Sequence, residues 1–308
     1  MKTFKISVHI PFYLSNKTEK KRRRNFKKIC QSFVKLSSKS KIFVHTNKKI
    51  HNSNKKIQFI YYNFKKDHPF KLTWYCRKMM EKQKNRFDVF IYSEDDILFT
   101  KKNFNYWLNY KDVCIKNNYN LGFLRAELNK KNKKLYSTDQ IEKANYFVKI
   151  MKKKFFVLKN PFYGFWIYDK NEFNKFVKTK WWSFNWNLRS VSGILHLREM
   201  AGWGWHGENL NGLHMGRYLA TIIPLKNMRP DKSSHVRHLS DNYANSPKGL
   251  FGTICLDNLL SKNLQIFRPD TIVTKVFKRI KNLTYYFLRI NIKNFFKKNK
   301  LHHDLLKR

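Results

Sequence analysis

The chain is short of acids, of turn-forming residues and of cysteine. Its 308 residues include only 20 Asp and Glu, 10 Gly, 7 Pro and 4 Cys. The cysteines lie far apart without CxxC or Cys/His spacing, which argues against a disulfide framework or a zinc site and favours reduced, buried thiols. No apolar run approaches the ~20 residues of a membrane helix, and the N-terminus lacks a small-residue signal cleavage site. We expect a cytoplasmic protein, soluble or peripheral on the inner face of the plasma membrane.

Core-forming residues and positive charge are abundant. Hydrophobic residues make up 42% and aromatic residues 17% of the chain, which is enough for a packed core. The formal net charge is +45, and such a charge suits a polyanionic partner. The lysines are spread over the whole chain together with Asn, Ile, Phe and Tyr, so compositional bias explains them better than a nucleic-acid site. The resulting field still favours negatively charged substrates, including a sugar diphosphate.

Strand and helix patterns alternate in the first half, residues 1–128. The run at 87–92, FDVFIY, is apolar except for Asp88 and is bounded by polar residues, which is typical of a parallel strand buried on both faces. The alternation predicts an open, mostly parallel α/β sheet flanked by helices. The expected strands are 5–12, 41–45, 56–62, 87–92 and 120–125, and the expected helices are 18–36, 69–84 and 102–116.

The second half, residues 129–270, predicts a less regular α+β unit. Short helical pieces are expected at 136–147, and a polar loop at 229–252. Further expected elements are strands at 155–158, 162–168 and 219–225, a helix at 172–177 and a mixture of helix and loop at 181–207. Residues 271–308 are expected to form a separate basic tail.

Three adjacent carboxylates, Glu94-Asp95-Asp96, follow the apolar run at 87–92. Ligands of open α/β sheets bind beyond the carboxyl ends of the strands. Clustered carboxylates repel one another unless a cation or hydrogen-bond donors compensate them. Mg²⁺ and Mn²⁺ take oxygen ligands and share them with substrate phosphates. In a chain so poor in acids, the triplet therefore predicts a site for a metal and a diphosphate.

Three segments in order resemble GT-A-fold glycosyltransferases over about residues 5–170. Residues 6–11, ISVHIP, resemble the first-strand signature of family 2 enzymes. Residues 93–96, SEDD, followed by FNYWL at 104–108, resemble the acidic motif and next helix of N-acetylglucosaminyltransferases with a Glu-Asp-Asp triplet. Residues 160–167, NPFYGFWI, resemble the acceptor-side segment of the same enzymes. The resemblance implies a metal-dependent hexosyl- or N-acetylhexosaminyltransferase acting on a glycan or lipid-linked acceptor.

The resemblance also implies roles on the donor side. Asp96 would bind Mn²⁺ or Mg²⁺, while Glu94 and Asp95 would bind the ribose or metal-bound waters. A nucleotide-sugar, expected to be UDP-linked, would place its base near the end of the first strand. Candidate contacts of this nucleotide are Pro11, Tyr13, Asp67 or His68, and Arg77 at a phosphate.

Transfer with inversion needs a carboxylate that deprotonates the acceptor hydroxyl. Glu199 and Glu208 are the candidates, since both lie among the glycines and tryptophans of residues 197–209, and Glu199 is preferred. If configuration were retained, neither assignment would follow. The acceptor itself would contact Gly164, Phe165, Trp166 and Trp203.

His235-Val236-Arg237-His238 forms a further group in the polar loop. Many GT-A enzymes complete the metal site with a late histidine, so His238 or His235 is implied as a second metal ligand. Arg237 or Arg229 could meet the diphosphate.

The tail interleaves Lys and Arg with Phe, Leu, Ile and Tyr at 275–300. Such a basic amphipathic pattern suits an anionic membrane surface, or a helix that packs on the domain with its basic face in water.

Two other functions compete with sugar transfer. A nucleic-acid-binding protein would explain the charge, but no known module is present and the triplet would repel phosphates. A metal-dependent phosphotransferase or nuclease would use the same acids, but would want carboxylates at further strand ends.

Overall fold

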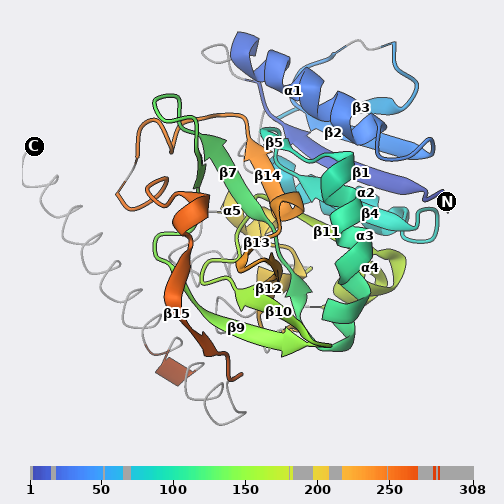
Figure 1. Ribbon diagram of the computed structural model, residues 1–308. Coiled ribbons are helices and arrows are strands. Elements are labelled where there is room, and N and C mark those ends of the chain that lie inside the picture. The colour runs from blue at the N-terminus through green and yellow to red at the C-terminus, as the bar shows by residue number, and fades with distance from the viewer. Residues whose placement is uncertain are drawn as a thin grey trace, which may run out of the picture.

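The computed structural model is a mixed α/β protein, as the sequence predicts (Figure 1). It describes residues 3–14, 19–50, 53–64, 71–179, 181–182, 197–207, 217–247, 249–269, 280–281 and 284.

The first sheet has five strands in the order β11-β4-β1-β2-β3. Strands β1 to β4 run parallel and β11 is antiparallel to β4. Their bounds are β1 Ile6–Phe12, β2 Ser40–Thr46, β3 Ile57–Tyr61, β4 Val89–Ser93 and β11 Phe165–Asp169.

Helices pack on this sheet because its central strands are buried throughout. Ile6, Val8 and Ile10 of β1 share one core cluster with Ile29 and Phe33 of α1 (Glu19–Val34). Helix α2 (Leu72–Lys82) supplies buried Cys76 and Met80 to a second cluster with residues of β2 and β4. Alternate side chains of a strand point to opposite faces, so an apolar run without polar gaps suits a strand in this central position.

Two further sheets complete the fold. One has the order β13-β12-β10-β9-β15, with β6 beside β12, and the other has the order β5-β14-β7-β8. The strands of the former are β6 Asn120–Leu121, β9 Ala144–Ile150, β10 Lys153–Val157, β12 Thr221–Lys226, β13 Arg229–Pro230 and β15 Leu260–Ile266. The strands of the latter are β5 Ile97–Leu98, β7 Leu124–Leu128, β8 Leu135–Ser137 and β14 His235–His238.

The remaining helices are short apart from α3 (Lys101–Lys116), whose N-terminus is capped by Thr100 in a capping box with Asn103. The others are α4 Lys170–Phe176, α5 Leu197–Gly202, and the 3₁₀ turns Lys232–Ser234 and Leu256–Asn258.

The second half departs from the sequence prediction at several places. Residues 136–147, expected as helical pieces, contribute to β8 and β9. Residues 120–125 divide between β6 and β7. The polar loop at 229–252 contains β14, which pairs with β5 and β7. Strands β6, β8 and β14 have only two to four residues each, so period-2 hydrophobicity does not reveal them.

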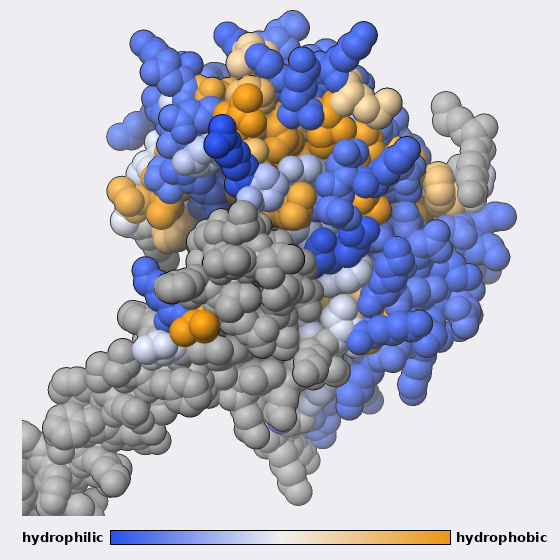
Figure 2. Space-filling view, turned by 90° about the horizontal axis from the view of Figure 1, so that it is seen from below, coloured by the Kyte–Doolittle hydropathy of each residue, from blue (hydrophilic) through white to orange (hydrophobic). Residues whose placement is uncertain are grey.

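The molecular face in Figure 2 is largely hydrophilic, and hydrophobic residues gather on a limited part of it. Within the described part of the chain, no helix is both long and apolar enough to cross a membrane. The basic segment 275–300 lies, except for residues 280, 281 and 284, outside the described residues.

Candidate functional site

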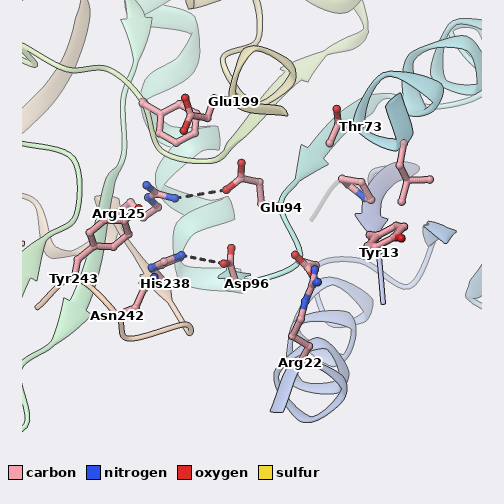
Figure 3. Close-up of a pocket in the computed structure, with 14 residues that line it drawn as sticks. Tyr13, Arg22, Thr73, Glu94, Asp96, Arg125, Glu199, His238, Asn242 and Tyr243 are labelled. Atoms are coloured by element: carbon pink, nitrogen blue, oxygen red, sulfur yellow. Dashed lines mark hydrogen bonds and ion pairs between the residues drawn. The ribbon is translucent and has the colours of Figure 1, made fainter. Parts of the chain in front are cut away.

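A cavity of about 550 Å³ lies at the carboxyl edge of the first sheet, where β1 and β4 end (Figure 3). It brings together segments from both halves of the chain. Its lining residues are Pro11, Tyr13, Arg22, Leu72, Thr73, Glu94, Asp95, Asp96, Arg125, Phe162, Glu199, His238, Asn242 and Tyr243.

The acidic triplet is held at both ends by backbone hydrogen bonds. The Glu94 N–H donates to Gly164 O at 2.9 Å, which extends the pairing of β4 with β11. The Leu239 N–H donates to Asp96 O at 2.8 Å, next to the pairing of β5 with β14. The three carboxylates therefore have a fixed backbone beneath them.

Glu94 lies in a narrow space beside two glycines. Gly164 has φ +72°, and a Cβ on it would come within 2.9 Å of Glu94 Oε2. A Cβ on Gly202 of α5 would lie 3.5 Å from Glu94 Oε1. Arg125 Nη1 is 3.5 Å from Glu94 Oε2, so the carboxylate has a charged partner as well (Figure 3). Gly164 thus makes room for Glu94, whereas a Cβ on Gly202 would be in ordinary van der Waals contact with it.

Asp96 pairs with His238 across the cavity (Figure 3). His238 Nε2 is 3.0 Å from Asp96 Oδ2, and Ser240 Oγ donates to the same oxygen at 2.7 Å. Burial alone would raise the pKa of Asp96, but the charge of His238 and these hydrogen bonds hold it well below its usual range. Burial alone would lower the pKa of His238, but Asp96 and a hydrogen bond to Glu127 raise it to about 9.

Glu127, at the end of β7, is a buried carboxylate that the sequence analysis did not select. It accepts hydrogen bonds from the backbone N–H groups of Asn242 at 3.1 Å, Tyr243 at 2.7 Å and Ala244 at 2.8 Å. It also pairs with His238 Nδ1. Burial alone would raise the pKa of Glu127, but these hydrogen bonds lower it. Glu127 therefore orients His238 and ties residues 242–244 to the cavity wall.

Arg125, also on β7, is a second residue of the cavity that no sequence pattern singled out. Its guanidinium forms a two-pronged ion pair with Asp139, with Nε–Oδ2 at 2.9 Å and Nη2–Oδ1 at 2.6 Å. Burial alone would lower the pKa of Arg125, but Asp139 and Glu94 raise it. Its only signal in the sequence was its place near the end of a predicted strand, where ligands of such sheets bind.

Arg22 of α1 pairs with Asp95, with Arg22 Nε donating to Asp95 Oδ2 at 3.1 Å. Burial raises the pKa of Asp95 to about 6; Arg22 opposes this shift and Asp96 adds to it. The residues of the triplet thus have different environments, with Glu94 beside Arg125, Asp95 beside Arg22 and Asp96 beside His238.

The donor set suits a hard cation that shares its ligands with a substrate. Asp96 Oδ1 is buried and has no hydrogen-bond partner within the described structure. No group of three or more His, Cys, Asp or Glu side chains in the described residues is arranged to hold a metal ion. Mg²⁺ is commonly held by one or two carboxylates plus phosphates rather than by a full protein cage. Asp96 fits that pattern. His238 would add a nitrogen ligand only after its hydrogen bond to Asp96 opens and the imidazole loses the proton that its raised pKa favours.

The structure brings only some of the other predicted site residues to the cavity. Pro11 and Tyr13 line the cavity, as does Glu199 from the first turn of α5. Asp67 and Glu208, like His68, lie outside the described residues. His235 does not line the cavity, because residues three apart on a strand point to opposite faces.

Arg77 does not line the cavity either, which corrects its expected contact with a phosphate. The guanidinium is buried, and Nη1 donates to the carbonyl oxygens of Trp181 at 2.6 Å and Trp182 at 2.9 Å. It also lies 4.1 Å from the ring centroid of Trp74. Arg77 is therefore part of the aromatic core.

The acceptor-side prediction also needs correction. Phe165 and Trp166 are fully buried in β11, and Trp203 is only 4% exposed, so none of the three is open to an acceptor. Gly164 instead accommodates Glu94. Phe162 is the aromatic residue of this region that lines the cavity, with Arg125 4.9 Å from its ring centroid.

Comparisons with known proteins give little further information. The sequence matches no family model and no curated protein. Among solved structures, the crystal structure of S. aureus TarS residues 1–349 is similar with a TM-score of 0.31 and 11% sequence identity, over 56% of this chain and 49% of that one. The chain thus spans about half the length of the structure that it matches.

Proposed function

We propose that this protein is a metal-dependent glycosyltransferase that moves a sugar from a nucleotide-sugar, expected to be UDP-linked, to a hydroxyl of a glycan or lipid-linked acceptor. One observation carries the proposal. The acidic triplet at the end of β4 shares a cavity of about 550 Å³ with the end of β1 on one side and with Glu199 of α5 on another. Such a cavity has room for a nucleotide and for a second substrate.

The donor would lie along the carboxyl edge of the sheet. Pro11 and Tyr13 support a nucleoside position there, and Arg22 offers a guanidinium to phosphate oxygens once it exchanges its contact with Asp95. Asp96, with His238, would hold Mn²⁺ or Mg²⁺, which supplies positive charge to the leaving diphosphate. Glu127 keeps His238 Nδ1 engaged and so directs Nε2 to the cavity.

Glu199 is the proposed base for an inverting transfer. Its carboxylate would take the proton of the acceptor hydroxyl while that oxygen bonds to the anomeric carbon. The bond from the anomeric carbon to the diphosphate oxygen breaks, and the nucleoside diphosphate leaves with the electron pair. Phe162, beside Arg125, provides an apolar surface for a sugar face on this side of the cavity.

A phosphotransferase or nuclease fits this geometry less well. It would need further carboxylates open to the cavity at neighbouring strand ends, but Glu127 is saturated by three backbone N–H groups and His238. Nucleic acid is also a poorer fit here, because four carboxylates line the cavity and repel a phosphate backbone.

Titration of nucleotide-sugars in the presence and absence of Mn²⁺ tests the proposal. We expect metal-dependent thermal stabilisation by a UDP-sugar or UDP. Asp96→Asn should remove the metal dependence, and Glu199→Gln should retain donor binding while transfer falls by about 10²-fold or more.

Lys149→Gln, at an exposed position of β9 that does not line the cavity, is the matched control and should behave as the wild type. Donor binding that is unchanged in Asp96→Asn, or that never needs a divalent cation, would contradict the metal assignment. Full transfer by Glu199→Gln would remove that residue as the base. A lack of binding to any nucleotide-sugar would refute the function itself.

A further inference from the structure

A second cavity lies at the opposite, amino edge of the first sheet. It has a volume of about 870 Å³ and is reached by the segments that lead into β1, β2, β3 and β4. Because β1 has seven residues, the two edges are about 20 Å apart. The sheet thus carries its acids at one edge and this cavity at the other.

Positive charge dominates the second cavity, which we call the basic cavity. Among its described lining residues there is no Asp or Glu, and none of its cationic side chains forms an ion pair with a described residue. One of these side chains makes a hydrogen bond within the described structure: Lys41 Nζ donates to Lys55 O at 3.2 Å. The cationic residues are Lys5, Lys39, Lys41, Lys55, Lys56 and Arg86. One carboxylate lies next to them, since Asp88 Oδ2 accepts a hydrogen bond from the Lys5 backbone N–H at 2.8 Å. The remaining excess of positive charge favours an anionic ligand.

The floor of the basic cavity is built from buried groups. Gln83 is 6% exposed, and its Oε1 accepts a hydrogen bond from Ser7 Oγ at 2.8 Å. In the described part of the chain, Gln83 Nε2 makes no hydrogen bond, so this amide can donate to a ligand. Phe43 and Phe87 pack edge to face beside it and add an apolar surface.

An apolar cavity of about 340 Å³ adjoins the basic cavity, and Ser38 lines both. Its walls include Phe4, Leu36, Phe104 and Leu108, which approach from the N-terminal segment, the end of the α1 region and α3. The one cation among its described lining residues, Lys101, donates to Leu36 O at 2.6 Å and lies over the Phe104 ring. Apolar atoms make up the larger part of the cavity surface, so this space suits hydrocarbon, although Thr3, Ser37, Ser38 and Asn105 also line it.

We propose that the two cavities together bind an anionic phospholipid, with the phosphate headgroup in the basic cavity and an acyl chain in the apolar one. The charge of the first and the apolar walls of the second match the two ends of such an amphiphile. The site is independent of the proposed sugar transfer, since it lies at the other edge of the sheet. It gives the protein a membrane contact outside residues 275–300.

The test uses the full chain and a soluble short-chain lipid, dihexanoyl phosphatidate, below its micellar concentration, with binding followed by calorimetry. Lys39→Glu with Lys56→Glu should raise its Kd about tenfold or more, because each reversal replaces attraction by repulsion. Lys130→Glu with Lys149→Glu makes the same charge change at exposed positions elsewhere and should leave the Kd within about twofold of the wild type.

A second pair keeps the test decisive if the reversals prevent folding. Lys41→Gln with Arg86→Gln neutralises two other cations of the cavity and should also weaken binding. Equal effects of the cavity pair and the control pair would overturn the proposal.

The apolar cavity separates a lipid from a free phosphate compound. Asn105→Trp, at an exposed α3 position that lines it, should weaken phosphatidate binding and leave inorganic pyrophosphate binding unchanged. Asn109→Trp, on the same helix but outside the cavity, is the control. If pyrophosphate binds as tightly as phosphatidate and Asn105→Trp changes neither, the ligand is a free phosphate compound and the lipid assignment fails.

Discussion

Gly164 provides the sharpest test of how the backbone shapes the candidate site. Its φ of +72° is a conformation that L side chains rarely adopt, and a Cβ there would meet Glu94 Oε2 at 2.9 Å and Ile97 Cδ1 at 3.2 Å. Gly164→Ala therefore incurs two separate penalties. The left-handed backbone costs about 1–2 kcal/mol, and the overlap with packed neighbours adds about 1–3 kcal/mol.

Gly249 offers a matched control, because its φ is +60° and a Cβ there meets no atom within 4 Å. Gly249→Ala should lose only the backbone penalty of about 1–2 kcal/mol. Urea denaturation of both variants gives the free energies of unfolding. The excess loss in Gly164→Ala then measures the overlap with Glu94 and Ile97.

A double-mutant cycle isolates the carboxylate. In a Glu94→Ala background Oε2 is absent, so Gly164→Ala should cost about 1 kcal/mol less than in the wild type. Donor binding by Gly164→Ala should weaken as well, because the new Cβ displaces Glu94 Oε2, the oxygen that pairs with Arg125. If Gly164→Ala and Gly249→Ala lose equal stability and the former binds donor normally, Gly164 does not position Glu94.

Three further predictions concern buried ionisable residues. Burial lowers the pKa of His45 from 6.5 to about 3, so between these pH values the unfolded chain binds a proton that the folded chain does not. The contribution of neutral His45 to stability is therefore present above pH 6.5 and falls by about 2 kcal/mol by pH 5. His45→Asn should flatten the pH dependence of the free energy of unfolding in urea. Asp139→Asn leaves the Arg125 guanidinium without its two-pronged partner and should cost about 3–5 kcal/mol in chemical denaturation; a loss below 1 kcal/mol would show that Glu94 compensates. Arg77→Met should leave donor Kd unchanged in the titration, since Arg77 lies outside the cavity; a tenfold weaker Kd would restore the phosphate contact.

Local sequence patterns were sufficient for the four parallel strands of the first sheet, β1 to β4, but they did not indicate that β11 from the second half of the chain joins this sheet or that residues 120–125 leave it. The strand predicted at 87–92 is β4, which spans Val89–Ser93, and the triplet after it lies at the strand's carboxyl end. Both follow from chain-local rules, since a strand buried on both faces must be apolar and must then leave the sheet. Pro11 and Tyr13, which the family resemblance implied as nucleotide contacts, lie near the triplet because β1 and β4 are parallel neighbours.

Long-range pairing decided the rest of the site. His235–His238 reads as a polar loop, yet it forms β14 because β5 and β7 supply backbone partners on both sides. Arg125 and Glu127 are charged residues of a strand. The free-energy cost of burying them is offset by Asp139 at Arg125, and by His238 and the backbone of residues 242–244 at Glu127. No sequence pattern indicates these partners, which lie up to 117 residues away.

The sequence by itself therefore determined where the acids are and that they follow a buried strand, since both depend on neighbouring residues. Only the tertiary structure decided what surrounds each acid: Gly164 and Arg125 at Glu94, Arg22 at Asp95, and His238 at Asp96. It also decided that Trp166 and Arg77 belong to the core. The physical reason is that burial and charge pairing arise from segments distant in the chain, whereas strand formation and the place of the triplet depend on hydrophobicity within a few residues.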